Sequence, residues 1–124
     1  AGFAYCDGNT WTNSSDRNIK ENFKNVDYSN VLAGIEKLKI ERWNYITDSL
    51  KTPHIGPMAQ DFYSIFSVGH DEKSLSTLDV DGVALSGIKA LIQENKILKK
   101  EIKTLKAKYE EMNQKLEQLL EAQQ

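Results

Sequence analysis

The sequence predicts an α+β protein: a small mixed globular part with short strands and helices, followed by a long C-terminal helix that forms a parallel trimeric coiled coil. In the last third, apolar residues recur at steps of three and four positions without a break. The rest alternates short aromatic and β-branched runs with turns rich in Gly, Asn and Pro. Hydrophobic residues make up 40% of the 124 residues and charged residues 27%. This composition is typical of one small folded unit and is too apolar for a disordered chain.

The N-terminal part predicts short strands, turns and then a helix. Residues 1–18 combine Gly, Asn and Ser with scattered aromatic residues, as strand and turn segments do. Within residues 19–38 we expect a short amphipathic helix, with Ser29 or Asn30 as its N-cap. Its apolar stripe consists of Val31, Leu32, Ile35 and Leu38.

The middle of the chain predicts a strand, a helix and a loop. Residues 39–46 are rich in β-branched and aromatic residues and predict a strand. Pro57 suits the first turn of a helix. The buried face of that helix would consist of Met58, Phe62, Ile65 and Phe66. The polar segment 68–77 predicts a loop, with or without a brief strand.

From Asp79 or Asp81, either of which suits an N-cap, the pattern is helical to the end of the chain. A heptad repeat starts at Ile88, in position a, and continues for more than four repeats. The predicted coiled-coil seam consists of Ile88, Leu91, Asn95, Leu98, Ile102, Leu105, Tyr109, Met112, Leu116 and Leu119.

Polar residues in this repeat predict its register and direction. Asn95 is the one polar residue at an a position, a device that fixes register at some cost in stability. In a parallel coil, Glu94 would face Lys99 of the neighbouring helix, and Glu101 would face Lys106. Each such surface pair contributes only about 0.2–1 kcal/mol, so these pairs select direction more than they stabilise.

The number of strands follows from the flanks of the seam. Ile at a with Leu at d favours dimers, but Ile92 and Leu120 at e positions widen the apolar face, and we expect a trimer. The alternative is a single helix folded against its own domain. The upstream part is too small to cover roughly 48 Å of helix, at about 1.5 Å per residue.

Composition excludes several classes of function. The net charge of −2 and the pI near 5.7 argue against a nucleic-acid-binding protein. Cys6 is the only cysteine, so neither an internal disulfide nor a cysteine-built zinc site is expected. The sequence has no apolar run long enough for a membrane span and no signal-peptide pattern. Its start reads like the interior of a longer polypeptide.

Few residues suggest a reactive site. His54 and His70 are the only histidines and have no metal-binding spacing, and the DVDG string at residues 79–82 lacks the ligands that should follow in a calcium loop. Ser15 and Lys20 lie five residues apart, and a neutral lysine can serve as base for a serine nucleophile. Taken alone, the spacing favours a solvated surface lysine after a helical turn capped by Ser15 or Asp16.

Four blocks of the chain together resemble a known family. They are SSDRNIKENF, LKIERWNY, HIGPMAQDF and LDVDGVALSGIKALIQEN, in this order between Trp11 and Asn95. They resemble the C-terminal intramolecular chaperone auto-processing domains of bacteriophage tail spikes, tail fibres, neck appendages and endosialidases. The resemblance implies a homotrimer that aligns the fibrous N-terminal portion of its own polypeptide and then removes itself by autoproteolysis. It implies a virion fibre precursor that acts in the host cytoplasm; a bacterial surface protein is the alternative source.

The resemblance also implies a serine protease site with a Ser–Lys dyad, in which Ser15 is the nucleophile and Lys20 the base. It implies site support from Asp16, His54 and Gln60. We expect cleavage at Ser14–Ser15, with Ser15–Asp16 as the alternative.

The expected division is a cleavage segment at the end of the preceding fibre (1–14), a chaperone auto-processing domain (15–87) and a trimerisation helix (88–124). No cofactor, metal, nucleic acid or membrane partner is expected. Two other functions fit the same sequence: a permanent, non-catalytic trimerisation module, and a receptor-binding tip in which the loop 67–77 contacts a host surface.

Overall fold

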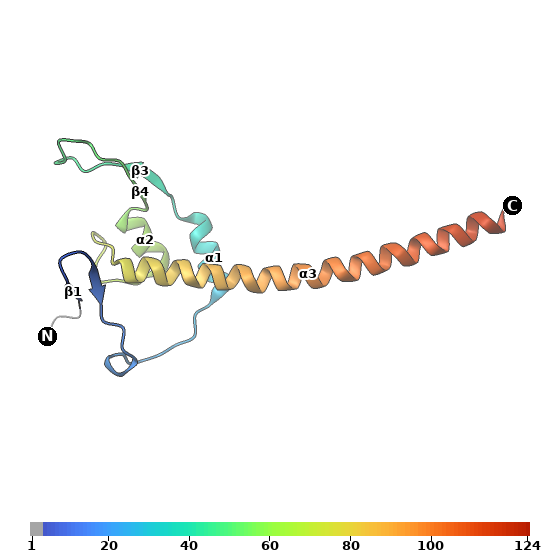
Figure 1. The fold of residues 1–124 in the computed structure, drawn as a ribbon, viewed down its shortest axis with the longest axis horizontal. Helices are drawn as coiled ribbons and strands as arrows, with labels where there is room; N and C mark the ends of the chain where they lie inside the picture. Colours follow the sequence, from blue (N-terminus) through green and yellow to red (C-terminus); the bar gives the residue numbers. More distant parts are fainter. Residues whose placement is uncertain (1–3) are drawn as a thin grey trace. The chain divides into compact units, whose positions relative to one another are not determined.

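The computed structural model describes residues 4–124, and its secondary structure is α+β, as predicted. The chain divides into two compact units, residues 1–87 and residues 88–124. The strands are short and pair in two separate antiparallel hairpins. The last helix, α3 (Thr77–Ala122), is unbroken over 46 residues and belongs to both units (Figure 1).

The N-terminal hairpin joins β1 (Ala4–Cys6) to β2 (Trp11–Asn13), with Ala4 opposite Asn13. Its turn is held by the Asp7 carboxylate, which accepts hydrogen bonds from the backbone N–H groups of Asn9 and Thr10 at 3.0 and 2.9 Å. The prediction of strands and turns is therefore confirmed here; residues 1–3 lie outside the described part.

The helix expected within residues 19–38 occupies the second half of that range. α1 spans Tyr28–Lys37 and contains the predicted apolar stripe except Leu38, which is its C-cap. Among the described residues before α1, the 3₁₀ turn η1 (Arg17–Ile19) is the only helical segment. The predicted N-caps, Ser29 and Asn30, are wrong. Asp27 caps α1 because its carboxylate accepts from the backbone N–H of Asn30 at 3.1 Å, and Asn30 is thus a donor to the cap.

The second hairpin replaces the single long strand expected at residues 39–46. β3 (Glu41–Trp43) pairs with β4 (His54–Gly56), a strand that was not predicted, in the register Trp43 opposite His54. The pairing is limited to three residues on each strand, Glu41–Trp43 opposite His54–Gly56, and so β3 is shorter than predicted. Sequence periodicity cannot detect a strand as short as β4 between two prolines.

The helix predicted after Pro57 exists, but it starts two residues later. α2 spans Ala59–Phe66 and follows Met58, which is still extended, so Pro57 continues the chain leaving β4. Of the predicted buried face only Phe62 is fully buried, at 2% exposure; its ring lies 4.9 Å from that of Phe66, which is half-buried like Ile65.

α1 packs closely on α2 and on the start of α3. A Cβ atom added at Gly34 would lie 2.6 Å from a ring carbon of Phe66, and one added at Gly87 would lie 2.6 Å from the Ile35 side chain. These glycines let the helices approach each other.

The N-caps predicted for the long helix, Asp79 and Asp81, are also wrong. α3 begins at Thr77, and the Ser76 hydroxyl accepts from the backbone N–H of Leu78 at 3.2 Å. Both aspartates therefore lie inside the helix, where Asp79 adds negative charge to the first turn and so suits the helix dipole.

Candidate functional site

The structure brings the Ser15 and Lys20 side chains together. Lys20 Nζ donates a hydrogen bond to Ser15 Oγ at 2.5 Å. Ser15 lies two residues after the end of β2, and Lys20 is the residue that ends η1. Both residues are exposed in the single chain. A serine hydroxyl in contact with a lysine amine is the arrangement that a Ser–Lys nucleophile requires.

One turn of backbone produces this contact. Asp16 is the N-cap of η1, and its Oδ1 atom accepts from the backbone N–H of Asn18 at 2.9 Å and from Asn18 Nδ2 at 3.0 Å. The Lys20 N–H donates to the Arg17 carbonyl at 3.2 Å and closes the turn. The chain is thereby folded back within five residues, and the two functional side chains meet.

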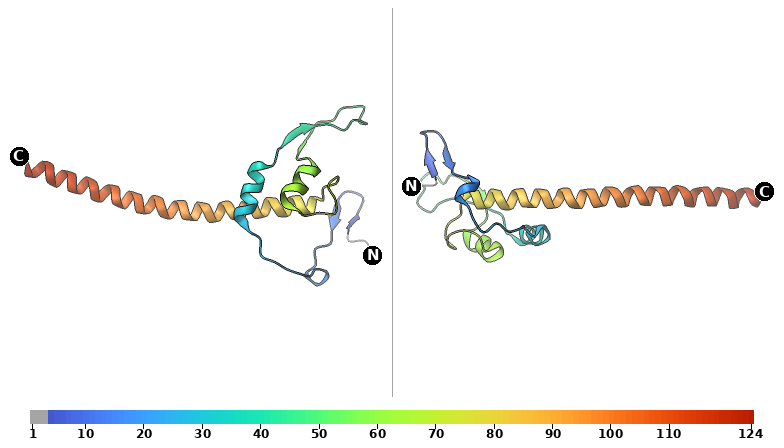
Figure 2. Two further views of the ribbon diagram at one scale, coloured as in Figure 1. Left: turned by 180° about the vertical axis from the view of Figure 1, so that it is seen from behind. Right: turned by 90° about the horizontal axis from the view of Figure 1, so that it is seen from below.

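The chain after Lys20 returns toward the same turn. Asn22 has a left-handed backbone with φ of 57°, a conformation that asparagine tolerates better than most residues. The Arg17 guanidinium carbon lies 5.5 Å from the centroid of the Phe23 ring, which allows a cation–π contact. We call residues 15–23 the dyad loop. Figures 1 and 2 show that the segment from this loop to α1 contains no helix or strand.

Arg17, Asn18, Asn22 and Phe23 were not singled out from the sequence. The Asp16–Asn18 spacing of the cap was a readable signal, because aspartate often accepts from the backbone two residues on. The Arg17–Phe23 contact had no sequence signal, since it depends on the left-handed turn between them.

His54 lies on β4 in an aromatic cluster. Its ring stacks on Trp43 with centroids 4.8 Å apart and meets the Tyr45 ring edge-on at 5.5 Å. The Trp43 Nε1 atom is buried, and no hydrogen-bond partner for it lies among residues 4–124. Gln60 is exposed in the first turn of α2. Within residues 4–124, no hydrogen bond or ring contact joins His54 or Gln60 to the Ser15–Lys20 pair.

The loop between β3 and β4 is ordered by one carboxylate. Asp48 accepts from the backbone N–H groups of Thr52 at 2.8 Å and Leu50 at 2.9 Å. Hydrogen bonding from Thr52, and then from the Leu50 backbone, holds the pKa of Asp48 below its ordinary value of 3.8. The Ile46 and Leu50 side chains of this loop are exposed.

The loop 67–77, which would carry receptor contacts in the binding-tip alternative, contains no strand. Asp71 orders it by accepting from the backbone N–H groups of Lys73 at 2.7 Å and Ser74 at 2.8 Å. These bonds, with the Lys73 backbone first, lower the pKa of Asp71.

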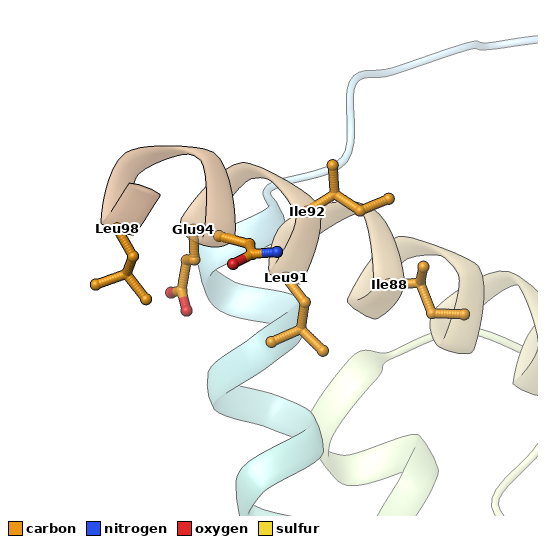
Figure 3. Close-up of a pocket in the computed structure, with 6 residues that line it drawn as sticks. Ile88, Leu91, Ile92, Glu94 and Leu98 are labelled. Carbon is orange, nitrogen blue, oxygen red and sulfur yellow. The ribbon is translucent and has the colours of Figure 1, made fainter. Parts of the chain in front are cut away.

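The apolar residues of the predicted seam are all exposed in the single chain. A shallow groove along α3 is lined by Ile88, Leu91, Ile92, Glu94, Asn95 and Leu98. Figure 3 shows Leu91, Glu94 and Leu98 on the same side of the helix and Ile92 on another. Farther along, Lys115 and Glu111 form an ion pair at 2.9 Å.

Neither a metal centre nor a membrane span emerges from the described residues. Across residues 4–124, no cluster of three or more His, Cys, Asp or Glu side chains could hold a metal ion. In the same range, no helix is long and apolar enough to cross a membrane.

Comparison with protein families gives one match. The family model Peptidase_S74, described as chaperone of endosialidase, matches residues 15–68. The matched segment starts at Ser15 and includes the dyad loop, α1, the second hairpin and α2. Comparison with curated proteins gave no match, and neither did comparison with solved structures.

Proposed function

We propose that this chain is an intramolecular chaperone of a tail-spike or tail-fibre type protein, because residues 15–68 match the chaperone of endosialidase family. It assembles as a homotrimer, aligns three copies of the preceding fibre and then releases itself by autoproteolysis. The family description supports the chaperone role, and its peptidase name fits self-processing. The observation that carries the proposed chemistry is the hydrogen bond between Lys20 and Ser15.

The surface of the single chain supports self-association. Large apolar side chains that a folded monomer would cover are exposed, among them Trp11 at 75%, Leu50 at 85% and Leu105 at 67%. The exposed side chains include the apolar seam of α3 and large apolar residues of the first unit.

A coil of this kind suits a fibre chaperone. Interwoven fibres are rich in contacts between distant residues, and such contacts cost closure entropy before they form. A helix forms from local contacts and can bring three chains together early. If the Glu94–Lys99 pairing holds, the three chains point the same way and start the fibre in register.

The proposed cleavage is an acyl shift at Ser15 followed by hydrolysis. Ser15 Oγ attacks the carbonyl carbon of Ser14 and forms an ester as the Ser14–Ser15 amide C–N bond breaks. The hydroxyl proton passes to the neutral Lys20 amine and then to the departing Ser15 nitrogen. Water next hydrolyses the ester, which leaves a Ser14 carboxylate and a released domain that begins at Ser15. Cleavage at Ser15–Asp16 is the alternative.

The exposure of the pair bears on when cleavage occurs. Ser15 and Lys20 are in contact but open to water in the single chain. Exclusion of water strengthens the electrostatic interactions within a reacting site. Neighbouring copies that cover the dyad loop would therefore activate the pair, and cleavage would follow assembly.

Intact mass of the purified protein over time tests this proposal. Wild type should yield a fragment that begins at Ser15, and Ser15→Ala and Lys20→Ala should each abolish it. Ser14→Ala is the matched control, because it changes the adjacent serine and should still be cut. A wild-type trimer that stays intact would refute autoproteolysis.

The same measurement separates the proposed function from the two remaining ones, because neither of them includes self-cleavage. A permanent trimerisation module would stay uncut and remain bound to its fibre. A receptor-binding tip would also be retained on mature particles, and changes in the loop 67–77 would then weaken attachment to the host. The hydrogen bonds of Asp71 that order the loop 67–77 fit such a surface. These bonds join residues of that loop to one another and do not involve the dyad loop.

A further inference from the structure

The contact between Ser15 and Lys20 depends on a turn that has little other support. η1 is three residues long, and none of its residues is buried. Its two backbone hydrogen bonds, from Ile19 to Asp16 and from Lys20 to Arg17, are long at 3.3 and 3.2 Å. The bonds to the Asp16 carboxylate, at 2.9 and 3.0 Å, are the shortest within the turn.

Asp16 itself does not touch the reacting atoms. Its Oδ1 atom accepts from the two donors of Asn18, its backbone N–H and Nδ2. Within the described chain, no hydrogen bond or ion pair joins the Asp16 carboxylate to Lys20 Nζ or Ser15 Oγ. The hydrogen bonds of Asp16 therefore connect it to the pair through the turn that contains Asn18.

We propose that Asp16 is the positioning residue of the dyad, and that it acts through an acceptor oxygen and not through its negative charge. This inference rests on the proposed autoproteolysis. By holding Asn18, Asp16 sets the turn that places Lys20 Nζ against Ser15 Oγ. On the other side of the turn, Arg17 and Phe23 hold the outgoing chain.

The test is the single-turnover rate of self-cleavage in two Asp16 variants of the whole chain. Asp16→Asn keeps an oxygen that can accept from the Asn18 N–H and should cleave within about twofold of wild type. Asp16→Ala removes the acceptor, and we expect cleavage roughly tenfold slower, as the loss of an N-cap and a displaced reacting pair imply. Asn18→Ala keeps the backbone donor and should fall between the two.

A matched control excludes a general loss of stability. Asp27 caps α1 in the same way, accepting from both the backbone N–H and Nδ2 of Asn30. Asp27→Ala should leave the cleavage rate of folded protein close to wild type. Equal slowing by Asp16→Ala and Asp27→Ala would overturn the inference, since both would then act through the fold.

The pH dependence of cleavage separates the acceptor from the charge. If Asp16 only positions the pair, the pH–rate profile of Asp16→Asn should match that of wild type. A profile displaced along the pH axis, or an Asp16→Asn variant as slow as Asp16→Ala, would show that the charge matters and would refute the inference. An uncut wild type would instead refute the proposed function, and a product beginning at Asp16 would refute the positioning role by placing this residue at the scissile bond.

Discussion

The heptad seam makes a quantitative prediction about two adjacent residues of α3. Leu98 belongs to the predicted seam and Ile97 does not, yet in the single chain their exposed fractions are nearly equal, at 53% and 57%. Full burial of such a side chain stabilises by about 1.5–3 kcal/mol. About half of the Leu98 side chain remains to be covered, so assembly gains roughly 0.8–1.5 kcal/mol per chain and about 2.5–4.5 kcal/mol per trimer.

Leu98→Ala should therefore lower the trimer association constant by roughly a hundredfold to a thousandfold, whereas Ile97→Ala should change it little. Sedimentation equilibrium at several protein concentrations measures both constants, best in the Ser15→Ala background that prevents cleavage. Alanine favours the helix in both variants, so helix propensity cannot explain a difference. Equal effects of the two substitutions would refute the seam, and a wild-type mass of two chains would refute the trimer.

Two further predictions concern the first unit. Gly34→Ala should lower the free energy of unfolding by about 1–3 kcal/mol, because the new Cβ would lie 2.6 Å from the Phe66 ring. At Gly82 a new Cβ would meet no atom of the described residues within 4 Å, so Gly82→Ala should raise the free energy of unfolding by about 0.5–1 kcal/mol. Thermal unfolding measures both changes, and equal effects would contradict the packing argument. The Asp48 carboxylate has a lowered pKa in the folded state, so its bonds in the β3–β4 loop should persist above pH 3.8 and be lost only as the pH falls through that lower value. An acid titration of the Thr52 amide followed by NMR checks this, with Asp48→Asn as control, and a midpoint above 3.8 would contradict it.

The helical part of the fold was the easiest to predict. The seam repeats over more than four heptads, and a long periodic signal survives any single exception. The helix ends were predicted poorly, because Asp27 and Ser76 cap α1 and α3 in place of nearby residues of equal capping ability. The residue that acts as N-cap is the one at which the backbone changes from extended to helical. The sequence offers several candidates for that position and does not rank them.

The candidate site, like the helices, was predicted in part from the sequence and in part was not. The partnership of Ser15 and Lys20 came from resemblance, since the residues alone favoured a surface lysine. The structure adds the reason that the two side chains meet, which is a 3₁₀ turn too short to produce any periodic pattern. The expected support of the site by His54 and Gln60 stays a prediction. In the single chain, the His54 ring contacts the rings of Trp43 and Tyr45.

The dyad loop and the coil differ in what they need in order to form, and this difference bears on the timing of cleavage. The contact between Ser15 and Lys20 spans five residues and is made within one chain, so it can form as soon as the turn does. The predicted seam of α3, in contrast, would need other copies of the chain. Under the proposed autoproteolysis, formation of the pair would therefore not be the step that delays cleavage until the fibre is aligned. A later change would control cleavage, and exclusion of water from the two exposed side chains by neighbouring copies is the change that we propose. On this reasoning, Leu98→Ala should slow cleavage at low protein concentration and recover at high concentration, whereas Asp16→Ala should be slow at every concentration.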